Sequence, residues 1–244
     1  MPLSHGTMKL GSCITRINHR DDTLTKVIIR PTCLTACSDY EPNESDYESD
    51  DDNDSLDALN LEVRGSREWF GILGVKFARL TNLTQLTFDG LDPDNADLEL
   101  FWGEISASIS LTSLYYTNMN LESCEEMLAA VNAQNLTSIT FKGCTIPNNI
   151  GCFLHQEGQE EPNNRLTTLS FIECCFNNTN TIREILEFAT ELAHLTSIRS
   201  FWFTSCLLDT DQSMCLVRCL REERISRDDV QIHCTTLLGD RQTV

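Results

Sequence analysis

The stretch LTSITFKGCTI at residues 136–146 decides the fold, because the chain repeats it with its apolar positions kept. It returns as LTTLSFIECCF at residues 166–176 and as IRSFWFTSCLL at residues 198–208. Its opening phrase also stands at residues 83–86 and 111–114. Apolar residues alternate with polar ones inside each copy, which is the period of a β-strand with one buried face. Such regular recurrence predicts a chain built of stacked structural repeats.

The fourth position of this pattern is apolar and marks eight units, spaced by 25 to 32 residues. The marker residues are Val27, Leu59, Leu86, Leu114, Ile139, Leu169, Phe201 and Val230. The units at Leu59 and Val230 fit least well, because Ser66 and Arg227 stand where the pattern asks for an apolar side chain. The sixth position is occupied by Ile29, Leu61, Phe88, Tyr116, Phe141, Phe171, Phe203 and Ile232. We therefore predict a buried ladder of mostly aromatic side chains.

The full pattern, L-x-x-L-x-L-x-x-(N/C)-x-L, resembles the leucine-rich repeat in its cysteine-containing, ribonuclease-inhibitor-like form. The resemblance covers roughly residues 24–237. It implies an α/β fold, a right-handed leucine-rich-repeat solenoid shaped as an arc or horseshoe, with about seven or eight repeats. In this fold the parallel sheet forms the concave face and the helices form the convex face. One strand and one helix cannot bury their apolar sides alone, so neighbouring units stack.

Apolar residues at three- and four-residue spacing predict helices after the strands. The expected helices cover residues 66–79, 95–108, 121–133, 180–194 and 211–223. Residues 147–165 are expected to form an irregular convex loop with at most a short turn near Cys152, because Gly151, Gly158 and Pro162 interrupt any long helix. All 244 residues are interpreted as one domain.

An acidic segment interrupts the repeats near the amino terminus. Residues 31–63 contain eleven Asp and Glu residues and no Lys or Arg, in a chain whose net charge is −19. Residues 36–54 also lack large aliphatic side chains, so we predict a disordered acidic insertion there. Two interpretations of it remain open. It is a solvated loop that aids solubility, or it attracts a basic partner through its acidic side chains, Asp50, Asp51 and Asp52 among them.

The twelve cysteines follow the repeat rather than a disulfide pattern. Cys144, Cys174 and Cys206 occupy the same pattern position, where the resemblance implies a buried thiol that turns the chain after the strand. Residues 1–20 lack the apolar stretch of a secretory signal. Free thiols persist in reducing compartments, so we expect a cytoplasmic or nuclear location.

Composition and motifs exclude several classes of function. A net charge of −19 repels phosphate backbones, so we expect no nucleic-acid binding, and the apolar runs are too short to span a membrane. The chain has no phosphate-binding loop, no Gly-x-Ser-x-Gly elbow and no paired-carboxylate motif, which favours a protein without enzymatic activity. Cys and His residues lie in distant units, so we expect no metal site and no cofactor.

The pattern places its fifth and seventh residues on the open concave face. Small hydroxyl side chains prevail there, and Thr suits any strand, so one interpretation is an unspecialised wet surface. Tyr115 and Trp202 are large aromatics on this face and are the best candidate anchors for a partner, since interfaces concentrate aromatics. Further candidates on the same face are Glu62, Asp89 and Lys142.

These observations predict a protein–protein interaction scaffold that presents a concave leucine-rich-repeat surface and an acidic loop. Its partner is a protein, and the acidic loop favours a basic one. Two alternatives stay open: an inhibitor or GTPase-activating type of enzyme regulator, as in some relatives of the family it resembles, or a fragment of a larger leucine-rich-repeat receptor. One scaffold of this kind hosts many functions, so the resemblance does not separate them.

Overall fold

The computed structural model describes part of the 244 residues. The described residues are 25–31, 58–63, 73–77, 79–91, 101, 110–122, 135–154, 165–177, 181–195, 197–222, 230–235 and 241–243. The acidic residues 36–54, and with them Asp50, Asp51 and Asp52, lie outside this part.

One open sheet of nine strands runs through the described residues, in the order β11-β10-β9-β7-β5-β4-β3-β1-β2. The strands are β1 Lys26–Pro31, β2 Ala58–Val63, β3 Gln85–Asp89, β4 Ser113–Thr117, β5 Ser138–Lys142, β7 Thr168–Ile172, β9 Ser200–Thr204, β10 Gln231–Thr235 and β11 Arg241–Thr243. Neighbours pair in parallel except β11, which runs antiparallel to β10. The expected α/β class with a parallel sheet is confirmed.

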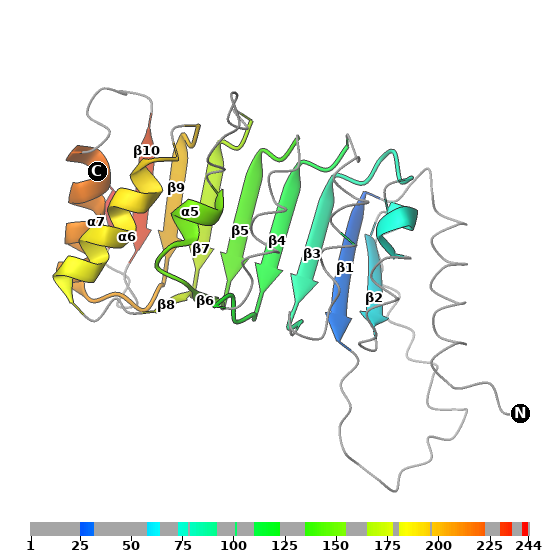
Figure 1. Cartoon of the computed structure of the whole chain (residues 1–244), viewed down its shortest axis with the longest axis horizontal. Helices are drawn as coiled ribbons and strands as arrows, with labels where there is room; N and C mark the ends of the chain where they lie inside the picture. The colour runs from blue at the N-terminus through cyan, green and yellow to red at the C-terminus, as the bar shows by residue number, and fades with distance from the viewer. Residues whose placement is uncertain are drawn as a thin grey trace, which may run out of the picture.

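Helices lie on one side of this sheet (Figure 1). The helices whose full bounds are described are α5 Ile150–Leu154, α6 Ile182–Ala193 and α7 Thr210–Glu222. Helices α6 and α7 pack against each other and coincide with two of the predicted helices. Helix α5 is a short helix inside the segment 147–165 that was expected to be irregular, and residues 155–164 of that segment are outside the described part. Two short strands, β6 Thr145–Ile146 and β8 Cys175–Phe176, pair beside the main sheet and were not predicted.

The predicted aromatic ladder is confirmed and forms the centre of the core. Phe88, Tyr116, Phe141, Phe171 and Phe203 are all at most 1% exposed. Consecutive rings stack nearly parallel, with centroids 5.8, 5.4, 5.4 and 5.2 Å apart. The ladder faces the helices, since Phe188 of α6 meets Phe171 edge to face. Each unit therefore buries its apolar face only by stacking on its neighbours, so burial depends on the array.

Threonines of the repeated Leu-Thr phrase join the units. The hydroxyls of Thr84, Thr112, Thr137 and Thr167 each donate to the backbone carbonyl at the corresponding position of the preceding unit in the sheet, at 3.1 to 3.3 Å. The backbone amides of the same threonines donate to the same carbonyls. These bonds satisfy polar groups just before each strand begins, which explains why the phrase keeps Thr beside Leu.

A residue in the left-handed conformation directly follows each of the strands β3, β4, β5, β7 and β9. Gly90, Asn118, Gly143, Glu173 and Ser205 share the eighth pattern position and have φ between 51° and 65°. Each donates its backbone amide to a carbonyl of the next strand, for example Gly143 to Ile172 at 2.8 Å. Glycine and asparagine adopt this conformation readily, whereas Glu173 and Ser205 pay a conformational cost. The turn is therefore imposed by the stack rather than by the local residue.

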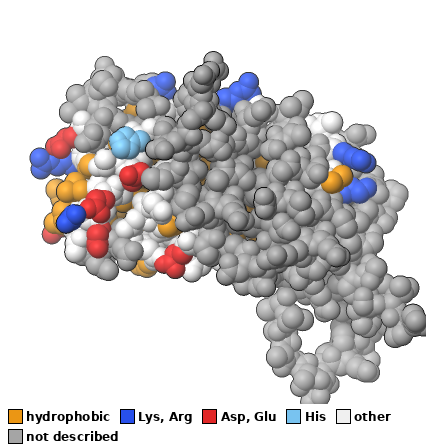
Figure 2. Space-filling model, viewed as in Figure 1, with side chains coloured by type: hydrophobic (Ala, Val, Ile, Leu, Met, Phe, Trp, Pro, Cys, Tyr) orange, Lys and Arg blue, Asp and Glu red, His pale blue; other side chains and the backbone are white. Residues whose placement is uncertain are grey.

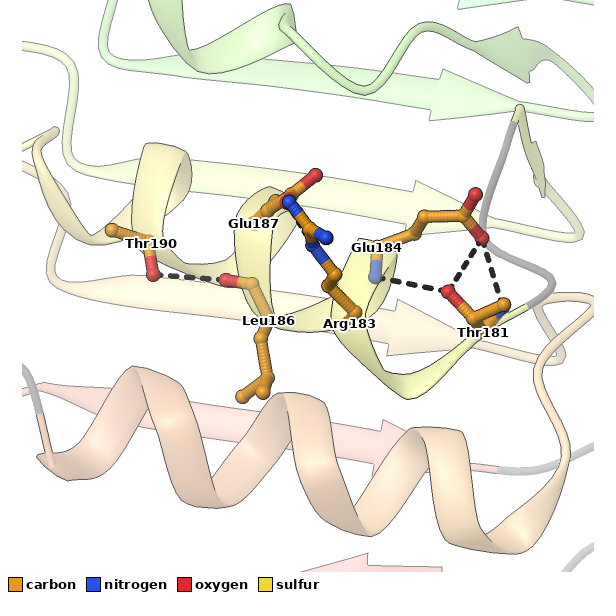
Figure 3. A network of polar contacts seen from close by, with 6 residues as sticks. All are labelled: Thr181, Arg183, Glu184, Leu186, Glu187 and Thr190. Atoms are coloured by element: carbon orange, nitrogen blue, oxygen red, sulfur yellow. Dashed lines mark hydrogen bonds and ion pairs between the residues drawn. The ribbon is translucent and has the colours of Figure 1, made fainter.

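Helix α6 begins with a capping box, shown in Figure 3. The Thr181 hydroxyl accepts from the Glu184 backbone amide, and the Glu184 carboxylate accepts from the Thr181 amide at 2.8 Å. Asp209 and Gln212 exchange equivalent bonds at the start of α7, at 2.8 and 2.9 Å. Both pairs satisfy amides that have no partner inside a helix, which fixes where each helix starts.

Two details of the predicted stacking are wrong. First, the last unit is shifted by two residues: Ile232 pairs with Phe201 and Cys234 with Phe203, so Ile232 holds the fourth position in place of Val230. Ile232 and Cys234 are both buried, whereas Val230 is only partly buried. Apolar residues alternate at 230, 232 and 234, so the sequence fits either register, and the backbone pairing selects the later one.

Second, chain order is not kept at the amino-terminal end, where β1 lies between β2 and β3 (Figure 1). Arg30 of β1 is in register with Glu62 of β2 and forms an ion pair with Asp89 of β3. Stacking in chain order would have placed Glu62 and Asp89, two like charges, on adjacent strands. The observed order puts β1, with Arg30, next to β3, with Asp89.

Candidate functional site

The face of the sheet opposite the aromatic ladder is formed by the fifth and seventh residues of each strand. The fifth-position residues are Ile28, Thr87, Tyr115, Thr140, Ser170, Trp202 and His233. The seventh-position residues are Arg30, Asp89, Thr117, Lys142, Ile172, Thr204 and Thr235. The strands are in register, so these residues form two straight rows. We call this surface the open face.

Tyr115 and Trp202 are both on the open face, where the sequence predicted them. Tyr115 lies on β4 and is partly buried, while Trp202 lies on β9 and is 39% exposed. Strands β5 and β7 separate them, so the two side chains start about 14 Å apart at the usual strand spacing. Thr140 and Ser170 lie between them in the same row. The two aromatic rings therefore flank a strip of small hydroxyl side chains.

With Val230 at the fourth position, the pattern would put His233 at a seventh position beside Thr204, and the shifted register shows that this placement is wrong. His233 is at the fifth position, directly opposite Trp202, and the two rings stack with centroids 3.8 Å apart and planes 12° apart. Its Nε2 atom is buried without a hydrogen-bond partner among the described residues. This pair was not predicted from the sequence. If the buried sixth position had been assigned to Cys234, the pattern would have put His233 at the fifth position, opposite Trp202.

Asp89 belongs to a polar network on the open face. Its carboxylate pairs with the Arg30 guanidinium at 2.7 Å and accepts from the Asn118 side-chain amide at 2.9 Å. The Asp89 side chain is only 18% exposed, whereas that of Arg30 is 50% exposed. Asp89 is therefore held by its own chain, which leaves it less free to meet a partner. The Glu62 backbone lies on β2, at the end of the sheet beyond β1.

Lys142 lies on the open face at the end of β5 and is exposed. Its neighbours in the seventh-position row are Thr117 and Ile172, neither of which carries charge. Lys142 lies on β5, between the strands that carry Tyr115 and Trp202, and in the row next to theirs. The structure brings Tyr115, Lys142 and Trp202 onto one surface, and Asp89 lies one strand beyond Tyr115.

The repeated cysteines lie in the core and bond to the backbone. The thiols of Cys144, Cys174 and Cys206 each donate to a carbonyl of the neighbouring unit, at 3.3 to 3.4 Å. Burial raises the pKa of the Cys174 and Cys206 thiols to about 12 and raises that of Cys144 as well. Thiols with such pKa values stay protonated at neutral pH and are poor nucleophiles. Their geometry suits a structural role.

His233 and Cys234 are neighbours in sequence but point to opposite sides of β10. Cys234 is buried in the core, and burial raises its thiol pKa. His233 lies against Trp202 on the open face. A nucleophile and its base need hydrogen-bond contact, and these two residues point apart.

Two features are absent from the described residues. No three His, Cys, Asp or Glu side chains there gather closely enough to hold a metal ion. None of the described helices is both long enough and apolar enough to cross a membrane. In comparisons with known proteins, the chain matches no protein-family model and no curated protein.

Proposed function

We propose that this chain is a leucine-rich-repeat solenoid whose open face binds another protein, without chemistry of its own. Support for the repeat class comes from features that recur at fixed pattern positions. These features are the stacked ladder, the threonine-to-carbonyl bonds and the buried cysteine thiols. Each recurs at the spacing of the sequence pattern, as a solenoid of this class requires.

The observation that favours binding is the exposure of Trp202 on a face shared with Tyr115. A tryptophan side chain has a large apolar surface, and this residue is 39% exposed, so a partner that covers it would gain the free energy of burying that surface. Tryptophan and tyrosine are the residues on which binding energy concentrates at protein interfaces. His233 holds the Trp202 ring by stacking, which lowers the entropy lost when a partner docks on it.

The partner proposed here is a protein, and the scaffold is proposed to work in the cytoplasm or nucleus. Support for a reducing compartment comes from the buried Cys144, Cys174 and Cys206, whose thiols bond to backbone carbonyls. The acidic segment with Asp50, Asp51 and Asp52 is a separate candidate contact for a basic partner, outside the described residues.

Affinity capture with matched variants tests the proposal. The bait is the full chain, compared with a Tyr115→Ala and Trp202→Ala double variant and with Met214→Ala as the control. Met214 is 55% exposed on α7, on the helix side, so its loss removes a comparable apolar group from a different surface. We expect proteins that bind the natural chain and the control but not the double variant, and the same dependence after one captured protein is purified. Equal capture by all three baits would contradict the proposal.

A further inference from the structure

The part of the open face formed by strands β4, β5, β7, β9 and β10 differs in charge from the rest of the chain. Strands β4, β5, β7, β9 and β10 read SLYYT, SITFK, TLSFI, SFWFT and QIHCT. They contain no Asp or Glu, and Lys142 is their one fully charged residue, although the chain has a net charge of −19. Carboxylates of the same half of the molecule lie on the helices, with Glu184 and Glu187 on α6 and Asp211 on α7, and at the end of β7, where Glu173 follows the strand. In Figure 2, which shows the helix side, acidic and basic side chains gather over α6 and α7.

A partner on this part of the open face can contact side chains only. Strands β4, β5, β7, β9 and β10 each pair with a neighbour on both sides, so their backbone groups are already used. Addition of a strand from another chain needs a free edge, which these five strands do not have. Recognition therefore depends on the chemistry of the two exposed rows and not on backbone hydrogen bonds.

Charge on the partner is disfavoured at the centre of this surface. A Lys or Arg buried against Thr140 and Ser170 would lose its hydration without meeting a carboxylate of the five strands, and Lys142 would repel it. An Asp or Glu would meet one cation at most, at the edge of the strip. Hydroxyl groups exchange hydrogen bonds with water for bonds with a partner at low cost. Antibody-type binding surfaces also combine Tyr and Trp with small hydroxyl residues, and they bind proteins through their aromatic rings.

Resting on the proposed function, we propose that the open face takes an uncharged segment of a partner protein, with apolar or aromatic side chains that contact Tyr115 and the Trp202–His233 pair. The two contacts are about 14 Å apart, which an extended segment spans with roughly four or five residues. The segment crosses strands β5 and β7 over Thr140 and Ser170. The basic partner suggested by the acidic segment, if it binds, binds elsewhere on the chain.

A random peptide library displayed on phage, with peptides longer than this span, provides the test. It is selected on the full chain, and each enriched peptide is measured against the Tyr115→Ala and Trp202→Ala double variant. We expect enriched peptides that need both aromatics and have no net charge. Peptides that need both aromatics but are rich in Lys, Arg, Asp or Glu would overturn the inference and leave the proposed function standing. Enriched peptides that ignore both substitutions, or no enrichment at all, would overturn both.

Substitutions that place a charge at Thr140 test whether the bound segment is uncharged. Thr140→Glu and Thr140→Lys should each weaken an enriched peptide by at least about tenfold, because either charge is buried without a partner. Met214→Glu on α7 is the control, since it adds a charge on the helix side, and it should change the affinity by less than about threefold. Tighter binding to Thr140→Glu would reveal a basic segment and overturn the inference. Sedimentation of the purified chain completes the test, since a dimer that Trp202→Ala dissociates would make a second copy the occupant.

Discussion

Replacement of Phe141 by Ala should destabilise the chain by about 3–5 kcal/mol. Phe141 is fully buried, and its ring stacks on Tyr116 and on Phe171, both at 5.4 Å. Returning a buried Phe side chain to water costs about 2–3 kcal/mol, and each lost stack adds about 0.5–1.5 kcal/mol. The strands on both sides are fixed by their own pairing, so the cavity cannot close by a small shift. The ladder would be interrupted at its middle.

Urea unfolding followed by circular dichroism measures this loss, with two controls. Phe141→Leu fills most of the space but removes both stacks, so it should cost less than Phe141→Ala. Thr140→Ala, the outward neighbour on the same strand, should cost less than about 0.5 kcal/mol. Hydrogen exchange of the β5 amides would locate the effect, because stability in a stacked array is transmitted between neighbours. A loss below about 1 kcal/mol for Phe141→Ala would mean that the ladder does not hold the units together.

Three further predictions concern a left-handed residue after a strand, a threonine hydroxyl and two buried thiols. Glu173 has a φ of 54°, so Glu173→Gly should raise the free energy of unfolding by about 0.5–1 kcal/mol by relieving backbone strain, and a urea midpoint no higher than that of Glu173→Ala would refute this. Thr137→Val removes the hydroxyl that donates to the Thr112 carbonyl at 3.1 Å and should cost about 1 kcal/mol in urea unfolding, whereas Thr140→Val should cost almost nothing. The pKa of the Cys174 and Cys206 thiols is about 12 in the folded chain against an ordinary value of 9.0, so the unfolded chain loses these protons first. Their contribution to stability is therefore complete below pH 9 and is lost as pH rises toward 12. The decline in urea midpoint from pH 8 to pH 11 should be shallower in a Cys174→Ala and Cys206→Ala double variant, and an identical decline would contradict the assignment.

The repeated parts of the fold were predictable because one short pattern fixes both burial and register. Alternation around Ile139 and Phe141 identifies the strand, and its recurrence around Leu169 and Phe171 places the next strand beside it. The same alternation predicts which side chains face outward, and it therefore placed Tyr115 and Trp202 on one face, as the structure shows. Helix α6 was equally clear from its apolar spacing.

The remaining features depend on contacts that no local pattern contains. The register of β10 is ambiguous from sequence, since residues 230, 232 and 234 are all apolar. The stack of His233 on Trp202 could not be predicted because it depends on that register. The order of β2, β1 and β3 depends on which strands meet in the folded chain, and the ion pair between Arg30 and Asp89 follows only once that order is known. The bonds of the threonine hydroxyls depend on where a neighbouring carbonyl lies.

Site-specific photo-crosslinking in cells tests most directly whether the open face is the binding surface. A photoreactive amino acid replaces Thr204, which lies in the seventh-position row beside Trp202, or Met214 on the helix side. The proposed function predicts a protein adduct from position 204 that disappears when Trp202→Ala is added. Adducts from position 214 alone, or an adduct from position 204 that persists without the Trp202 ring, would contradict it.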